Sequence, residues 1–390
     1  MKRMGLAALL LTTSMAAGVL VGCGSSNSSA DSTLQQATSA DTKSDGATEG
    51  EGEKVKESSE DAPYIVFLEG TDANSWRTQC ENAMQKQADK YIASGEISKY
   101  KLFVANNDAT TQIQQMEQAI QDGAGAIIIN PVSTTGLTAT IDKATKAGIK
   151  VFSIDQHITH PDVISITNDQ YTWAKIQAEW FVKQIDGKGN IYVMNAIQGA
   201  PASDIREQAF NDVLSKYPDI KVIASDYGMW DEGKGKEIMT QWLATNKDYD
   251  AVLCQDGVAV GILEAIEAAG ANYPKAITSD EYIQYLKKWK EINDANPDEP
   301  LNAIIVENPP SIGVMGMKIA VRLLKGDQLK DDALQSDPAD PDNKNAIFYN
   351  PTTVITLDNM EEYYEKYKDA DDSSYIDTDM TDELIATYFK

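Results

Sequence analysis

Short apolar, β-branched runs alternate with longer amphipathic segments from residue 63 almost to the end of the chain. Between most of these runs lies one segment with helical spacing, such as the apolar face formed by Ile113, Met116, Ala119 and Ile120. This alternation is typical of parallel sheets covered by helices. The predicted strands are residues 64–68, 101–105, 126–129, 150–154, 163–166, 190–194, 221–224, 251–253, 276–278 and 303–306.

The predicted strands fall into two similar sets, one before and one after residue 167. Residues 63–390 exceed the length that one hydrophobic core usually serves, so we expect each set to form its own open sheet. The predicted fold class is therefore α/β, with two doubly wound parallel-sheet lobes. The segment from Asn343 to Lys390 suggests two more strands and two more helices, to which we assign no function.

Polar and aromatic residues follow the carboxyl ends of these strands. In open parallel sheets ligands bind just beyond those ends, so these positions are the candidate ligand site. The candidate residues are Asn74, Trp76, Arg77, Asp155, Gln156, Arg206, Trp230, Asp256, Asp280 and Glu307.

This mixture of side chains suits a neutral sugar or polyol. Carboxylates and amides can bind two neighbouring hydroxyls, arginine donates in a fixed fork, and the face of tryptophan packs against the C–H face of a sugar. A phosphorylated or acidic ligand would require more cations than Arg77 and Arg206 supply.

Other roles stay open for several of these residues. Trp76 could be a core contact, and Trp230 could anchor a loop. Asp155 and Asp280 could cap the helices that follow them, and Arg206 could form a surface ion pair.

The first 23 residues have the features of a secretory signal. Lys2 and Arg3 precede an apolar stretch that ends in Leu20-Val21-Gly22-Cys23. The stretch is shorter than the ~20 apolar residues that span a bilayer, which disfavours an uncleaved transmembrane helix. The ending resembles the lipobox of bacterial lipoproteins. It implies a signal peptide over residues 1–22, a lipid on Cys23, and a location outside the cytoplasm, on the cell surface or in the periplasm.

Residues 23–62 are predicted to form a disordered tether behind the lipidated Cys23. From Gly24 to Ala62 there is no aromatic residue, and Leu34 and Val55 are the only large aliphatic ones. Such a segment cannot bury enough apolar surface to offset the entropy of ordering.

Charge and composition exclude several function classes. The net charge is −26 and no basic cluster with interleaved aromatics occurs, so nucleic acid is not an expected partner. Besides Cys23 the chain has Cys80 and Cys254, which we predict to be buried thiols without a disulfide. With His157 and His160 as the only histidines, we expect neither a zinc site nor another cofactor.

The chain from Pro63 to about Leu357 resembles the type I periplasmic binding proteins of the ribose- and galactose-binding kind, the solute receptors of ABC sugar importers. Matching segments recur in the same order over most of the folded chain. They are Asn74–Arg77, Ile129–Pro131, Ser153–Gln156, Thr167–Asp169, Ala202–Glu207, Gln255–Asp256, Thr278–Asp280 and Glu307–Pro309.

The resemblance implies a role for each candidate residue. Asn74, Trp76 and Asp155 would contact the sugar from the first lobe, and Glu307 would lie at a crossing between the lobes. The second lobe would contribute Arg206, Trp230, Asp256 and Asp280.

Four positions depart from the pattern of the family. Arg77 replaces an aromatic residue and Gln156 replaces an arginine, while Asp256 and Glu307 stand where amides are common. The predicted pocket is more acidic than usual, which argues against ribose itself.

The resemblance also implies two lobes that close around the ligand by a hinge of three crossings, near Thr167, Glu307 and Asp337. The N-terminal lobe would comprise residues 63–167 and about 308–336, and the C-terminal lobe residues 168–307 and about 337–390. The expected partners are a small sugar and an importer permease, with the protein a monomer held at the membrane by the lipid on Cys23.

Three other functions stay as alternatives: an anchored carbohydrate-active enzyme, a sensor for a chemotaxis or signalling partner, and a sugar-responsive repressor. No catalytic motif supports the enzyme, and a signal stands where a repressor needs its DNA-binding helices. Residues 228–235 nearly spell a P-loop, but Gly235 replaces the required Ser or Thr. The acidic stretch from Asp331 to Asp342 lacks the order of a calcium loop, so we predict a solvated loop there.

Overall fold

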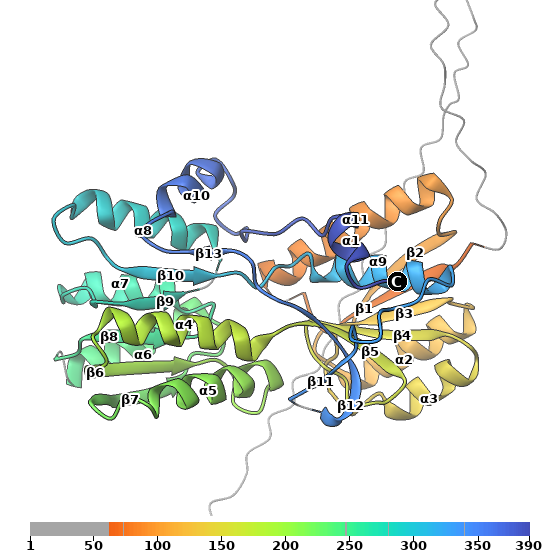
Figure 1. Cartoon of the computed structure of the whole chain (residues 1–390), viewed down its shortest axis with the longest axis horizontal. Helices are drawn as coiled ribbons and strands as arrows, with labels where there is room; N and C mark the ends of the chain where they lie inside the picture. Colours follow the sequence, from red (N-terminus) through yellow and green to blue (C-terminus); the bar gives the residue numbers. More distant parts are fainter. Residues whose placement is uncertain (1–61, 73, 246–247, 280, 339) are drawn as a thin grey trace, which may run out of the picture. The chain divides into compact units, whose positions relative to one another are not determined.

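The computed structural model describes residues 62–72, 74–245, 248–279, 281–338 and 340–390. In this part of the chain strands and helices alternate and build two sheets (Figure 1). All ten predicted strands are present, each within three residues of its predicted bounds. The predicted signal, Cys23 and nearly all of the tether lie outside the described residues.

The first sheet has seven strands in the order β11-β12-β5-β4-β3-β1-β2. Its strands are β1 (Tyr64–Glu69), β2 (Lys99–Val104), β3 (Ala126–Ile129), β4 (Lys150–Ile154), β5 (Val163–Asn168), β11 (Gln335–Asp337) and β12 (Asp340–Tyr349). All neighbours run parallel except the edge pair β11–β12, which is antiparallel. Both faces are buried, because Ile65 and Phe67 join one core while Val66 and Leu68 join the other.

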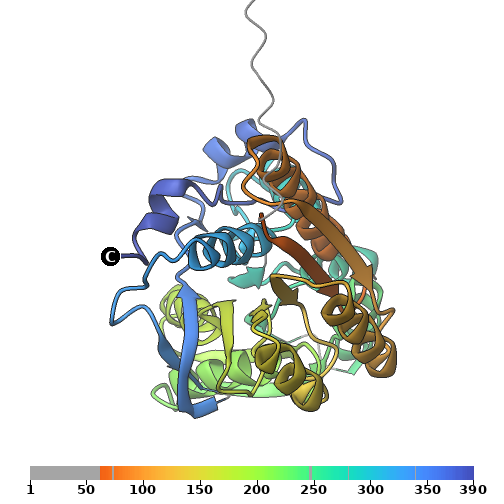
Figure 2. The same cartoon turned by 90° about the vertical axis from the view of Figure 1, so that its right-hand side faces the viewer.

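Helices cover both faces of this sheet and complete the first lobe. One face packs against α1 (Ser75–Ser94), α9 (Ile312–Leu324) and α11 (Asp382–Ala386), and the other packs against α2 (Ala109–Gln121) and α3 (Thr138–Lys146). Figure 2 shows α1 and α9 side by side. Their close approach requires glycine at position 313, where a Cβ atom would lie 2.6 Å from Cys80 Sγ.

The second sheet has six strands in the order β13-β10-β9-β8-β6-β7. Its strands are β6 (Gly189–Asn195), β7 (Ile220–Tyr227), β8 (Ala251–Cys254), β9 (Ile277–Ser279), β10 (Ala303–Val306) and β13 (Val354–Ile355), of which β13 alone is antiparallel to its neighbour. One face packs against α6 (Glu232–Thr245), α7 (Ala259–Ala269), α8 (Ile283–Ala295) and α10 (Met360–Tyr367), and the other against α4 (Gln170–Gln184) and α5 (Pro201–Leu214). These elements form the second lobe.

The described chain passes between the lobes four times. It crosses from β5 to α4, from β10 to α9, from β12 to β13, and from α10 back to α11 (Figure 1). The crossings predicted near Thr167 and Glu307 are present, but the one predicted near Asp337 is wrong. There β11 and β12 extend the first sheet, because Ala346 of β12 pairs with Ser165 of β5.

The assignment of residues 337–390 to the second lobe is therefore corrected. Residues 335–337 and 340–349 belong to the first sheet, residues 354–367 belong to the second lobe, and residues 380–389 pack again on the first. The two strands and two helices expected after Asn343 correspond to β12, β13, α10 and α11.

Other expectations have mixed outcomes. Cys80 and Cys254 are both buried and form no disulfide, as predicted. The acidic stretch is not wholly solvated, because Asp337 and Asp340 are buried beside His157. Among the described residues, no group of three His, Cys, Asp or Glu side chains is arranged to hold a metal ion. No helix in the described ranges is long and apolar enough to cross a membrane.

Candidate ligand-binding cavity

A cavity of about 90 Å³ lies between the lobes, lined by residues that follow the carboxyl ends of strands in both sheets. Parallel strands place the loops after them at one edge of the sheet, which brings distant parts of the chain to one site. The lining residues are Asn74, Trp76, Arg77, Asp155, Gln156, Ala202, Arg206, Trp230, Asp256, Gly257, Asn308 and Tyr375.

Eight of the ten candidate residues from the sequence line this cavity. Asp280 lies outside the described residues, and Glu307 lies elsewhere in the structure. The eight are Asn74, Trp76, Arg77, Asp155, Gln156, Arg206, Trp230 and Asp256.

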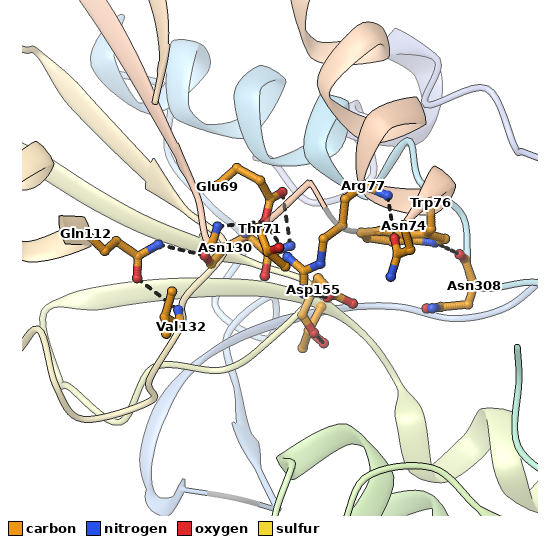
Figure 3. Close-up of polar contacts among 12 residues, drawn as sticks. Glu69, Thr71, Asn74, Trp76, Arg77, Gln112, Asn130, Val132, Asp155 and Asn308 are labelled. Carbon is orange, nitrogen blue, oxygen red and sulfur yellow. Dashed lines mark hydrogen bonds and ion pairs between the residues drawn. The ribbon is translucent and has the colours of Figure 1, made fainter. Parts of the chain in front are cut away.

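The first turn of α1 forms one wall of the cavity (Figure 3). Asn74 caps the helix by accepting a hydrogen bond from the backbone N–H of Arg77 at 3.0 Å. The indole Nε1 of Trp76 donates to the carbonyl of Asn308 at 2.7 Å, which fixes the orientation of the ring. The helix cap and the indole bond thus position Trp76 at the cavity.

Arg77 is held in place by a buried carboxylate that does not line the cavity. Its guanidinium forms an ion pair with Glu69, the last residue of β1, whose side chain is fully buried (Figure 3). Burial raises the pKa of Glu69 to about 7, although the charge of Arg77 opposes the shift. The pair therefore holds Arg77 at the cavity wall, but burying the charged carboxylate of Glu69 is unfavourable in free energy.

Asp155 follows β4 in an unusual backbone conformation, with φ of 63°. This left-handed region is unfavourable for a residue with a side chain, and such residues gather at functional sites. A carboxylate oxygen of Asp155 lies 3.8 Å from a guanidinium nitrogen of Arg77. Burial raises the pKa of Asp155, and Arg77 and Arg206 oppose the shift.

Arg206 of α5 forms the corresponding wall of the second lobe. Its Nε donates to Gln170 Oε1 at 2.7 Å, and its Nη1 donates to Asp256 Oδ1 at 2.6 Å. The guanidinium also lies over the ring of Trp173, 4.0 Å from the ring centre. Arg206 is only 1% exposed, so these contacts fix it in one orientation.

Trp230 closes the cavity from the loop between β7 and α6. Its backbone has φ of 53°, again in the left-handed region. Gly257 packs directly against this backbone, and a Cβ atom there would lie 2.9 Å from the Trp230 carbonyl oxygen. Among the described residues the buried Trp230 Nε1 has no hydrogen-bond partner, so it is a donor that a ligand could use.

Glu307 lies at the crossings between the lobes, as predicted, but it does not line the cavity, which corrects its listing among the ligand-binding residues. Its carboxylate accepts hydrogen bonds from the Tyr349 hydroxyl at 2.6 Å and from the backbone N–H groups of Thr352 and Thr353 at 2.7 and 2.9 Å. The Thr378 hydroxyl donates to its second oxygen. Burial alone would raise the pKa of Glu307, but these hydrogen bonds outweigh burial and lower it.

The sequence reasoning missed four lining residues, Ala202, Gly257, Asn308 and Tyr375. The first three lie within or beside segments that were singled out, so their positions after strands could have revealed them. Tyr375 is different. It lies twenty residues after β13, the last strand in the described part of the chain, where no strand-end rule applies.

The formal charges that line the cavity cancel. Arg77 forms an ion pair with Asp155, and Arg206 forms one with Asp256. Both pairs line the same cavity. Together with the tryptophans, this arrangement can bind hydroxyl groups in fixed directions and cover an apolar ring face.

Comparison with known families identifies the fold. A family model described as a periplasmic binding protein domain matches residues 65–328, more than half of the chain. The chain belongs to this family. The two-lobed parallel-sheet fold predicted from the sequence is thereby confirmed.

Relatives of this periplasmic binding protein come from several bacteria. It is 27% identical to the ribose import binding protein RbsB of Salmonella typhimurium, over 53% of this chain and 68% of the relative. It is 26% identical to a xylitol-binding protein of Mycolicibacterium smegmatis, over 56% of this chain and 61% of the relative. A solved ABC transporter solute-binding protein from Thermobispora bispora has a TM-score of 0.69 and 27% identity, over 83% of this chain and 94% of that one.

Proposed function

We propose that this periplasmic binding protein is a lipid-anchored receptor that binds one small neutral sugar or polyol and delivers it to an ABC importer. The observation that carries the proposal is the cavity between the lobes, where two arginine–carboxylate pairs and two tryptophans converge. Names among its relatives, one a ribose import protein and one a xylitol-binding protein, support the same ligand class.

The lining residues favour a neutral polyhydroxylated ligand. Because Arg77 and Arg206 already face carboxylates, an anionic ligand would find no surplus of positive charge. Asp155 and the Nε1 group of Trp230 offer an acceptor and a donor to hydroxyl groups. The ring faces of Trp76 and Trp230 suit the C–H face of a sugar.

Binding energy would come from contacts with both lobes at once. Asp155 and Arg77 belong to the first lobe, whereas Arg206, Asp256 and Trp230 belong to the second. A ligand that contacts both sets stabilises the closed arrangement over an open one. The closed form would then be the form that the permease recognises.

A thermal-shift screen of the purified protein against pentoses, hexoses, deoxysugars, polyols and short oligosaccharides tests the ligand class. We expect at least one pentose, hexose or polyol to raise the melting temperature, with a Kd of roughly micromolar or tighter, about −8 kcal/mol. Phosphorylated sugars serve as the matched control and should give no shift. The proposal fails if only charged ligands bind, or if the protein converts the sugar that it binds.

The anchor is tested separately. If Cys23 carries the lipid, the intact protein should fractionate with membranes and a Cys23→Ala variant should not be lipidated. Mass spectrometry of the mature N-terminus measures the modification directly. An unmodified Cys23 in the mature protein would rule out the anchor but would leave the proposal for the cavity unaffected.

A further inference from the structure

The last crossing of the chain contributes a residue to the cavity. After α10 the chain returns from the second lobe to the first, and residues 371–378, here called the C-terminal strap, run between α1 and the start of α8 (Figure 1). The family match ends at residue 328, so the strap lies outside it. Tyr375 of the strap lines the cavity.

The strap is attached to the second lobe by its backbone. The Ile283 N–H donates to the Ser374 carbonyl at 3.0 Å, and the Ile376 N–H donates to the Glu281 carbonyl at 2.8 Å. The rings of Tyr282 and Tyr375 lie 4.7 Å apart between centres. The second lobe therefore bonds the residues before and after Tyr375 and also contacts its ring.

The strap is attached to the first lobe by side chains. The amide of Gln79 on α1 bonds both backbone groups of Tyr375, accepting from its N–H at 2.9 Å and donating to its carbonyl at 3.2 Å. The carboxylate of Asp377 accepts from the Ser311 N–H at 3.1 Å and from the Ser311 hydroxyl at 2.7 Å. The strap that carries Tyr375 is thus attached to both lobes.

The two sides of the strap face different spaces. Tyr375 faces the ligand cavity, whereas Ser373, Ser374 and Asp377 line a separate groove of about 490 Å³ along α1. The strap, together with the first turns of α1, therefore lines both spaces.

We propose that the C-terminal strap determines which ligands the cavity accepts, with Tyr375 in direct contact with the bound molecule. This inference rests on the proposed function and extends it to the selection among sugars and polyols. The phenol adds a ring face and a hydroxyl to a cavity that Trp76 and Trp230 also line. Because the strap is bonded to both lobes, a change in the distance between the lobes would also move Tyr375.

Ligand panels on Tyr375 variants test the proposal. For the compound that binds best to the unmodified protein, we expect Tyr375→Ala to raise the Kd by about tenfold or more and to change the order of preference within the panel. Tyr375→Trp keeps an aromatic ring beside Tyr282 but adds volume, so it should weaken hexoses more than pentoses. Tyr367→Ala, a change of the same kind in α10 away from the cavity, is the matched control.

The outcomes separate the two proposals. A panel in which the unmodified protein binds no sugar or polyol overturns the proposed function. A panel in which it binds, while both Tyr375 variants keep every Kd within twofold and the same order, overturns the strap and leaves the function standing. If Tyr375→Ala does not fold, the hexose and pentose affinities of Tyr375→Trp decide the matter.

Discussion

The two lobes each bring an arginine and a carboxylate to the cavity, but they hold these groups differently. In the second lobe Arg206 is buried and bonded to Gln170 and Asp256 at 2.6–2.7 Å. In the first lobe Arg77 pairs mainly with Glu69 behind the wall, and Asp155 lies 3.8 Å from it. The second-lobe pair is thus a rigid unit, whereas Asp155 forms only a longer ion pair with Arg77 and lines the cavity.

This difference predicts a division of roles. A group that is bonded on several sides at short distance contributes to stability as well as to binding, while a carboxylate in a longer ion pair contributes mainly to binding. Four predictions test this division, from the largest expected effect to the smallest.

Arg206→Met should be the most damaging change. It leaves Asp256 and Gln170 without their buried partner, and breaking a buried pair in this way costs about 3 kcal/mol or more of the free energy of unfolding. Sugar affinity should fall by more than tenfold as well. Chemical denaturation and calorimetry measure both effects. Arg322→Met, a change at the half-exposed Arg322–Asp327 pair, is the control and should leave affinity unchanged.

Glu69→Gln should change how stability depends on pH. Because the pKa of Glu69 is raised to about 7 in the folded protein, the folded state holds this proton more tightly than the unfolded state does. Its contribution is present below pH 4.5 and is lost as pH rises towards 7, by on the order of 3 kcal/mol at most. Denaturation at pH 4.5, 5.5 and 7 should show a flatter profile in the variant. Parallel profiles for both proteins would contradict the assignment of this titration to Glu69.

Asp155→Asn should separate binding from stability. The change preserves the shape of the side chain but removes the charge, so sugar affinity should weaken by more than 1.5 kcal/mol, or over tenfold. Stability should stay within about 1 kcal/mol, because burial already disfavours the charged form. Calorimetric titration together with thermal unfolding measures the two quantities. An affinity within twofold of the unmodified protein would mean that Asp155 does not contact the ligand.

Trp230→Phe should have the smallest effect of the four. It keeps an aromatic ring but removes the Nε1 donor that has no partner among the described residues. Loss of one neutral hydrogen bond should weaken binding by roughly 1 kcal/mol, about fivefold. Trp242→Phe in α6, away from the cavity, is the matched control. Equal affinities for the Trp230 variant and the control would remove this donor from the proposed site.

Much of the site could be predicted from the sequence because strand ends are local features. Asp155 directly follows the apolar run of β4, and Asp256 follows β8. The pattern that predicts each strand therefore also predicts which polar residues lie at the edge of the sheet where ligands bind. The same rule failed for Glu307, which directly follows β10 but bonds to residues of the crossings. Whether a carboxylate faces a ligand or a neighbouring segment depends on contacts that the strand pattern does not contain.

The misplaced third crossing has a related cause. The resemblance to the family implied a crossing near Asp337, but the course of the chain is decided by the pairing of β12 with β5, about 180 residues earlier. Tyr375 was missed for the same reason, since its position depends on Gln79 of α1 and on Tyr282, which precedes α8. Long-range contacts of this kind carry no local signal.

The pairing of β12 with β5 also has a consequence for the order of events during synthesis. The first lobe begins with β1 at Tyr64 but gains its last strands only at Tyr349, whereas strands β6 to β10 of the second lobe are complete by Val306. At the usual rate of translation, the edge of β5 waits roughly 10–40 s for its partner. The first lobe therefore exposes an unpaired strand edge until most of the second lobe has been made, and such an edge invites association with other chains.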